Sequence, residues 1–246
     1  MSGLDHRWYG RPIERDADPF SPLRAGLVVS CQAPAGSPLR APAIMAAMAR
    51  AAACGGACGI RAEGAADVAA IRDAVRLPVI GLRKLDLPGS PVRITPTLES
   101  AAEVVGAGAS IVAVDATDRA RADGTGARAF VRRVRDELGV PVLADVDALG
   151  AGLAAREVGA AAVATTLSGY TGPGGAPEGP DLELVAALAA RLDCPVLAEG
   201  RYATPAQVRD AFGAGAFAVV VGAAITDPVA LTRRLAGATP VAEGAA

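Results

Sequence analysis

Eight short apolar runs, spread along the whole chain, restrict the possible folds more than any other feature. They span residues 26–32, 57–62, 78–84, 110–117, 141–147, 161–169, 195–201 and 216–224. Each run is nearly continuous in apolar residues, whereas a strand with one face in water alternates apolar and polar residues. Continuous runs are typical of parallel strands that are buried on both faces. The pattern therefore predicts one large parallel sheet.

Helical, Ala-rich stretches with charged residues on one face lie between the runs. One of them opens with Thr204 as N-cap and Pro205 at the first helical position, and it stops at Gly213 and Gly215. Eight β/α units can close into a barrel or form an open doubly wound sheet. The count of eight favours the barrel, and so does the absence of a GxGxxG turn after the first run. We expect an α/β fold, a (β/α)8 TIM barrel.

Length and composition fit a single domain of this kind. A (β/α)8 barrel commonly takes about 250 residues, and this chain has 246, of which 52% are hydrophobic. We predict an N-terminal extension at 1–25 and the barrel at 26–240. The extension lacks the apolar core of a signal peptide, and no run reaches the roughly 18 apolar residues of a membrane span. We therefore expect a cytoplasmic protein with no membrane partner.

Cysteine spacing and net charge exclude two further classes of function. The four cysteines form no CxxC pair and the chain has one histidine, so no zinc-binding spacing exists. We expect no metal, and reduced cysteines as in the cytoplasm. The net charge is −2 and no basic stripe stands out, which argues against a nucleic-acid partner. A small anionic substrate remains compatible with a locally positive pocket.

Polar residues end nearly every apolar run. In a (β/α)8 barrel the active site lies at the C-terminal ends of the strands. Burying many ionisable groups there without a function would cost several kcal/mol each unless they were paired. The set therefore predicts a catalytic pocket, in which Thr165 is one of the substrate-binding candidates. Its members are Gln32, Arg61, Lys84, Asp115, Asp145, Thr165 with Thr166, Glu199 and Gly222.

Lys84 and Glu199 end the third and seventh runs, which lie opposite each other in an eight-stranded barrel. Two groups that approach one carbon from opposite sides can invert a stereocentre. The alternative is a Lys84–Glu199 ion pair that only braces the mouth of the barrel.

A phosphate site is expected at the loops after runs seven and eight, where barrels often bind phosphate. These loops contain Gly200 and Arg201, and Gly222 and Ala223. Glycine lets the backbone approach an oxyanion, Arg201 adds charge, and a helix N-terminus follows each loop. The same glycines can equally serve simple turns. The Gly- and Pro-rich stretch 169–181 follows the sixth run, where a loop would cover an active site.

The chain resembles bacterial N-acetylmannosamine-6-phosphate 2-epimerases in seven segments, which occur in the family's order. They are VSCQAPAGSPLR (29–40), GGACGIRAEG (55–64), ITPT (94–97), DATDRAR (115–121), TTLSGYT (165–171), AEGR (198–201) and VVVGAAIT (219–226). Such a match is highly specific and extends roughly over residues 26–236. The resemblance implies a (β/α)8 barrel, usually a homodimer, with no metal or organic cofactor.

The resemblance also implies an activity. The family interconverts N-acylmannosamine 6-phosphate and N-acylglucosamine 6-phosphate at C2 during sialic-acid and amino-sugar breakdown. Its catalytic lysine falls on Lys84 and its catalytic carboxylate on Glu199, and its supporting polar residues fall on Gln32, Arg61 and Asp145. In the open-chain sugar the C2 proton is weakly acidic, so a neutral Lys84 can remove it, and Glu199 returns or relays a proton.

One departure from the family bears on the substrate. The family's loop after strand eight reads Ala-Ile-Thr-Arg-Pro, and here Asp227 replaces the arginine. An acid repels a phosphate. Either Arg201 and the backbone suffice, or Arg119 or Arg121 compensates, or the substrate is a different or unphosphorylated amino sugar.

Two other functions stay open at this point. One is a barrel enzyme that forms a Schiff base through Lys84. The other is a non-catalytic sugar-phosphate-binding barrel, in which Asp227 marks decay of the site.

Overall fold

The computed structural model describes residues 18–172 and 177–240. Its eight strands are all parallel to their neighbours and close into one barrel in chain order, with β8 beside β1. Each predicted apolar run overlaps one strand, so the predicted (β/α)8 barrel is confirmed. The strands are β1 (Leu27–Cys31), β2 (Gly59–Glu63), β3 (Val79–Leu82), β4 (Ile111–Asp115), β5 (Val142–Asp145), β6 (Ala162–Ala164), β7 (Val196–Glu199) and β8 (Ala218–Val221).

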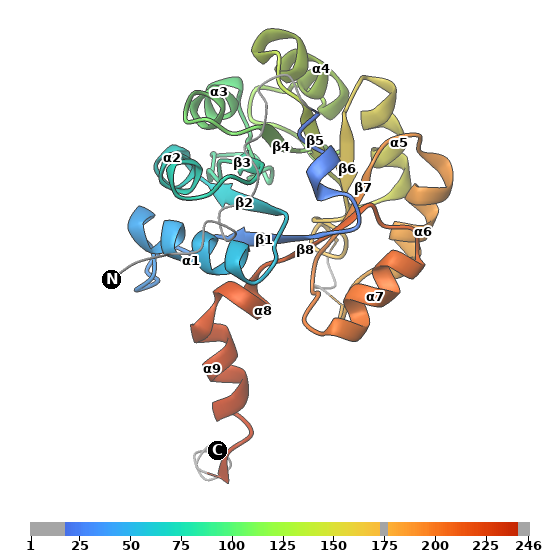
Figure 1. The fold of residues 1–246 in the computed structure, drawn as a ribbon. Coiled ribbons are helices and arrows are strands. Elements are labelled where there is room, and N and C mark those ends of the chain that lie inside the picture. The colour runs from blue at the N-terminus through green and yellow to red at the C-terminus, as the bar shows by residue number, and fades with distance from the viewer. Residues whose placement is uncertain (1–17, 173–176, 241–246) are drawn as a thin grey trace.

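The helices surround the barrel as an outer ring (Figure 1). Thr204 caps α7 as predicted, because its side chain accepts from the Gln207 N–H while the Gln207 side chain accepts from the Thr204 N–H. In the described part of the chain, no helix is both long and apolar enough to cross a membrane. The helices are η2 (Ser21–Leu23), α1 (Pro42–Cys54), α2 (Ala65–Ala74), α3 (Leu98–Gly106), α4 (Ala127–Leu138), α5 (Leu149–Glu157), α6 (Leu182–Arg191), α7 (Pro205–Gly213), α8 (Ala223–Thr226) and α9 (Pro228–Ala236).

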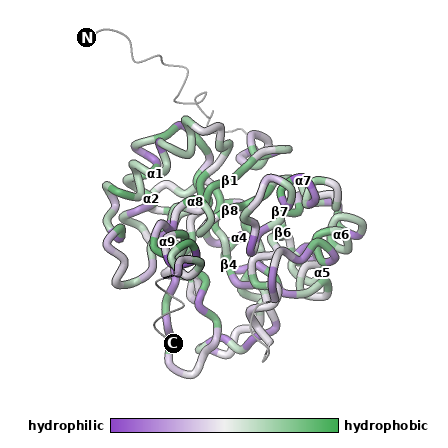
Figure 2. The backbone as a smooth tube through the Cα atoms, turned by 90° about the horizontal axis from the view of Figure 1, so that it is seen from below, coloured by the Kyte–Doolittle hydropathy of each residue, from purple (hydrophilic) through white to green (hydrophobic). Residues whose placement is uncertain are grey.

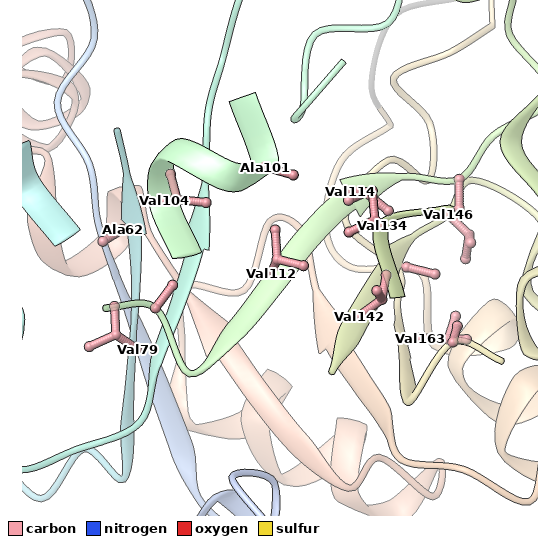
Figure 3. Packing of buried hydrophobic residues seen from close by; sticks show 14 of the residues in the cluster. Ala62, Val79, Ala101, Val104, Val112, Val114, Val134, Val142, Val146 and Val163 are labelled. Atoms are coloured by element: carbon pink, nitrogen blue, oxygen red, sulfur yellow. The ribbon is translucent and has the colours of Figure 1, made fainter. Parts of the chain in front are cut away.

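Strand β4 shows why the apolar runs are continuous. Ile111 and Ala113 belong to the cluster that fills the inside of the barrel. Val112 and Val114 belong to the larger cluster between the barrel and the helices (Figure 3). Successive side chains of a strand point to opposite faces, so both sets are buried and the run carries no polar alternation. Asp115 shares the inward parity of Ile111.

The floor of the barrel is closed by residues that precede β1. Phe20 and Leu23 are buried in the same cluster as the inward-facing side chains of the strands. Gly59 makes room for this plug, because a Cβ there would lie 2.5 Å from Leu23 Cδ2. Residues 1–17 of the predicted extension lie outside the described residues. The division at residue 25 therefore stays a proposal, and residues 20–23 pack as part of the barrel.

Helices α8 and α9 depart from the regular ring. After β8 the chain forms the short α8, and α9 then projects away from the body of the barrel (Figure 1). None of the residues of α9 is buried, and Leu235 is 67% exposed. The strands β1 and β8, by contrast, are mostly hydrophobic (Figure 2). Helix α9 thus lacks the apolar burial that stabilises the helices α1–α7 of the ring.

Candidate active site

Polar side chains on the inward face gather at the C-terminal end of the barrel. Strand β2 alternates Ile60 and Ala62, which face the helices, with Arg61 and Glu63, which face inward. Arg61 was expected to end the strand, but β2 continues two residues further to Glu63. Arg61 therefore lies deeper in the barrel than the sequence predicted.

Arg61 joins three strands through a buried charge network. Its Nη1 donates to Asp145 Oδ1 at 3.0 Å and to Glu199 Oε2 at 2.8 Å, and its Nη2 donates to Asp145 Oδ2 at 2.5 Å. The side chains of Arg61 and Asp145 are 1% and 0% exposed. Thr166 adds a hydrogen bond from Oγ1 to Asp145 Oδ1 at 2.6 Å. A guanidinium held this way fixes the position of the Glu199 carboxylate.

Lys84 lies two residues beyond β3, across the barrel from β7. Its backbone is fixed by an isolated bridge to Ile94. Among the described residues its amine has no ion-pair partner, since Glu199 pairs with Arg61 instead. The predicted alternative, a bracing Lys84–Glu199 ion pair, is therefore absent here. Burial, and next the positive charge of Arg61, lowers the pKa of Lys84, while Glu199 and Glu63 oppose the shift.

Glu199 is shifted in the opposite direction. Burial raises the pKa of this carboxyl group and Asp145 adds to the rise, while Arg61 counteracts it. The environment of the two groups thus favours a neutral amine at Lys84 and a protonated carboxyl at Glu199 more than water does. That is the arrangement of a general base and a general acid.

A cavity of about 570 Å³ opens at this end of the barrel. Seven of the ten predicted site residues line it: Gln32, Lys84, Glu199, Gly200, Arg201, Gly222 and Ala223. Arg61 and Asp145 lie buried beneath it, so the structure gives them a supporting position. Thr165 does not line it either, and its 2% exposed side chain is engaged with the main chain of β7. Its hydroxyl donates to the Glu199 carbonyl and accepts from the Glu199 N–H.

The alternation of side chains along a strand distinguishes Thr165 from Thr166. Ala162 and Ala164 face inward on β6, so Thr166 shares their side and Thr165 does not. Thr166 lines the cavity, as does Ser30. Parity alone, applied to each predicted strand, would also have selected Glu63 together with Arg61.

The other end of the cavity is formed by the loops after β7 and β8. Gly200 has φ +114° and Arg201 has φ +62°, so this turn lies in the left-handed region that favours glycine. The Arg201 guanidinium donates to the carbonyls of Ser168 (2.6 Å from Nη1) and Gly179. It also lies 5.2 Å from the ring centre of Tyr170. Arg201 therefore braces the described ends of the 169–181 loop; residues 173–176 lie outside the described residues.

Asp227 has a structural task at this end. Its Oδ1 accepts from the Ala230 N–H at 3.0 Å and caps α9. Arg119 is paired with Asp115 at 2.5 Å, and Arg121 is buried with its guanidinium on the carbonyls of Pro96 and Asp115. Neither lines the cavity, so the expectation that one of them replaces the missing arginine is not supported.

Arg234, which the sequence did not single out, does line the cavity. It lies seven residues after Asp227, two turns further along α9, and is exposed. Within the described chain it has no ion-pair partner. No sequence motif marks it; only the course of α9 brings it to this cavity.

One sequence signal strengthens Lys84 in retrospect. The chain holds 24 Lys and Arg residues, and Lys84 is the only lysine among them. Arginine stays charged at any physiological pH, whereas a lysine amine can become neutral when it is buried.

Among the described residues, no group of three His, Cys, Asp or Glu side chains is arranged to hold a metal. All four cysteines are free, as expected.

Comparison with known families agrees with this geometry. Residues 45–240 match the family model described as "NanE: Putative N-acetylmannosamine-6-phosphate epimerase". A solved N-acetylmannosamine-6-phosphate 2-epimerase from Clostridium perfringens superposes with a TM-score of 0.87 and is 35% identical. The match covers 94% of this chain and 100% of that one.

Curated relatives show the same relationship over most of the chain. A protein of Cutibacterium acnes named "Putative N-acetylmannosamine-6-phosphate 2-epimerase" is 48% identical over 212 residues, which cover 85% of this chain and 92% of that one. The "Bifunctional enzyme NanE/NanK" of Brucella melitensis is 50% identical over 210 residues, which cover 85% of this chain and 40% of that one. In the second case the similarity spans one part of a longer protein.

Proposed function

Because this chain belongs to the N-acetylmannosamine-6-phosphate epimerase family, we propose that it interconverts N-acyl-D-mannosamine 6-phosphate and N-acyl-D-glucosamine 6-phosphate at C2. Sialic-acid and amino-sugar catabolism is the setting that this reaction fits. One observation carries the proposal: Lys84 and Glu199 come from opposite strands and line one cavity. Burial shifts their pKa values in the directions that a base and an acid need.

The reaction begins with the open-chain sugar, in which C2 is next to the C1 aldehyde. The neutral Lys84 amine takes the C2 proton, and the electron pair of the broken C–H bond forms the enolate. Glu199 then supplies a proton to C2 from the opposite face, which inverts the stereocentre. The step leaves an ammonium ion and a carboxylate, and exchange with water restores both groups.

Arg61 and Asp145 act through Glu199 in this scheme. Their buried ion pair holds the carboxyl group at a fixed point on its side of the cavity. Gln32 is placed to bind the substrate directly. Its Nε2 donates to Ser30 Oγ at 2.7 Å, whereas its buried Oε1 has no partner within the described structure. A sugar hydroxyl or amide N–H would satisfy that acceptor.

We place the phosphate at the other end of the cavity, on the main-chain N–H groups around Gly200, Gly222 and Ala223. These residues line the cavity, and the backbone turns there without bulky side chains. Arg201 adds positive charge while it braces the loop above. The acidic side chain of Asp227, which also lines this cavity, favours a second candidate. That candidate is a related activity on an unphosphorylated or different amino sugar.

We further propose a cytoplasmic homodimer. Helix α9 supports the dimer, because it exposes Val229 and Leu235 and buries none of its own side chains. A second copy of the chain would cover this apolar surface. Sedimentation of the purified protein measures the state directly, and a monomer at all concentrations would contradict it.

A C2-exchange assay in deuterated water tests the activity. The enzyme should incorporate solvent deuterium at C2 of N-acetylmannosamine 6-phosphate during turnover, and the unphosphorylated sugar should react much more slowly. Equal rates for both sugars would favour the second candidate. Binding without exchange would contradict the epimerase, and borohydride trapping on Lys84 would replace it with Schiff-base chemistry.

A further inference from the structure

Glu63 is a buried carboxylate that contacts the main chain of Lys84, and the reaction proposed above does not use it. It ends β2 with an inward-facing side chain that is 9% exposed. Its Oε1 accepts from the Lys84 main-chain N–H at 3.2 Å and from Arg83 Nη1 at 3.0 Å. Its Oε2 lies 3.6 Å from Arg40 Nη2. One carboxylate thus connects the ends of β2 and β3 with the loop after β1.

The main chain around Lys84 explains why this contact matters. Leu85 N–H donates to the Arg93 carbonyl at 3.1 Å, and Thr95 N–H donates to the Arg83 carbonyl. These bonds anchor the residues on either side of Lys84 to the strand-like segment at Ile94. The Lys84 N–H takes no part in them, and in the described structure Glu63 is its acceptor. A partly buried N–H left without an acceptor would be costly, so the carboxylate defines where the Lys84 backbone rests.

Glu63 also contributes to the charge around the amine. Four charged groups act on the pKa of Lys84: Arg61 and Arg93 lower it, and Glu199 and Glu63 raise it. Arg61 and Glu199 are tied to each other. Glu63 is tied to Arg83 and Arg40 at the opposite edge. The charge of Glu63 therefore affects the Lys84 amine independently of the Arg61–Asp145–Glu199 network.

We propose that Glu63 is a positioning residue for Lys84, which fixes the Lys84 main chain through its N–H and balances the charge around its amine. The inference rests on the proposed function, in which Lys84 is the base. It predicts two separable effects, one on geometry and one on charge.

Two substitutions separate these effects. Glu63→Gln keeps an oxygen that accepts the Lys84 N–H but removes the negative charge, while Glu63→Ala removes both. We expect Glu63→Ala to lower kcat by about 10- to 100-fold with little change in KM, because a base displaced by about 1 Å loses rate on that scale. Glu63→Gln should restore kcat to within a few-fold of the wild type. Its pH profile should keep its shape, with the acid limb displaced to lower pH, because loss of the carboxylate disfavours the ammonium form.

The single lysine permits a direct structural readout. Protein labelled only with [15N]lysine gives one backbone amide signal in a 1H–15N spectrum, that of Lys84. A hydrogen bond to a carboxylate moves an amide proton downfield, so the signal should move upfield in Glu63→Gln and further in Glu63→Ala. Glu103→Gln is the matched control. Glu103 also pairs with Arg83, at 3.8 Å, and does not accept from Lys84.

The outcomes distinguish the two proposals. If the wild type exchanges C2 and Glu63→Ala retains its kcat, pH profile and Lys84 signal, the role of Glu63 is overturned and the epimerase stands. If the wild type shows no exchange, the proposed function itself fails. If Glu63→Ala does not fold, an unshifted acid limb and an unmoved Lys84 signal in Glu63→Gln would still contradict the inference.

Discussion

The two ends of the cavity are built in different ways. At the reacting end, Glu199 and Asp145 both accept from the buried guanidinium of Arg61, with contacts of 2.5 to 3.0 Å between strands. At the anion end, the lining consists of small residues around Gly222, a helix cap at Asp227 and the exposed Arg234. The reacting end is fixed by strands that the whole barrel holds in place. The anion end depends on two short helices, α8 and α9, at the edge of the fold.

The difference shows where the chain can vary without losing its chemistry. Displacing a catalytic group by about 1 Å can cost 100-fold in rate, and strands buried on both faces resist such displacement. Binding a phosphate through main-chain N–H groups depends little on side-chain identity. An acid such as Asp227 can therefore be accommodated at the anion end while Lys84, Glu199 and the Arg61–Asp145 pair stay in place at the reacting end.

Loss of Lys84 should produce the largest effect. We expect Lys84→Ala to lower kcat for C2 exchange by about 10³-fold, within the range for removing a general base. Lys84→Arg is the decisive control, because a guanidinium keeps the positive charge but cannot become a neutral base. Both variants should be inactive and folded, as circular dichroism can verify. An active Lys84→Arg enzyme would show that the residue only binds an anion.

Glu199→Gln should follow, with a loss in kcat of about 100-fold. Activity requires Lys84 to be deprotonated and Glu199 to be protonated. The wild-type profile of kcat/KM should therefore fall towards acid pH, where Lys84 holds its proton, and fall towards alkaline pH, where Glu199 loses its proton. The alkaline fall should be absent in Glu199→Gln, since the amide does not titrate. A fall that persists unchanged would assign it to another group.

Asp145→Asn tests the rigidity of the reacting end through stability. The change leaves the buried Arg61 charge with one carboxylate, and breaking a buried pair costs roughly 3 kcal/mol in the free energy of unfolding. Arg128→Ala breaks the exposed pair with Glu157, at 2.7 Å, and should lower the free energy of unfolding far less, because solvent screens this pair. Urea unfolding of the three proteins gives the comparison. Equal losses in the free energy of unfolding for both variants would show that the buried network stabilises the fold no more than an exposed ion pair does.

The sequence predicted residues at both ends of the cavity, because three of the six predicted at the reacting end and all four predicted at the anion end line it. Strand runs fix which residues reach the C-terminal edge, so Lys84, Glu199 and Gln32 could be identified without coordinates. The depth of Arg61 and the main-chain role of Thr165 differ from the prediction, because an apolar run does not fix the residue at which a strand ends or which of two adjacent threonines faces inward. Arg234 was missed since its position depends on α9, whose path follows no strand rule.

The smallest effect is expected at Arg234, the exposed side chain at the anion end of the cavity. We expect Arg234→Gln to raise KM for the 6-phosphate substrate by about 3- to 10-fold, since an exposed charge contributes about 1 kcal/mol. The change in kcat, and in KM for the unphosphorylated sugar, should be small. Arg233→Gln is the matched control, because this neighbour lies on α9 but does not line the cavity.

Asp227 offers the reverse experiment at the same end. Asp227→Asn keeps a side chain that can cap α9 but removes the negative charge, so KM for the 6-phosphate should fall by a similar factor. Both shifts should shrink as salt rises, since exposed charges are screened beyond about 8 Å at physiological ionic strength. If neither substitution alters the preference for the phosphorylated sugar, the main-chain N–H groups bind the phosphate without help. The anion end would then bind the phosphate through its main chain alone.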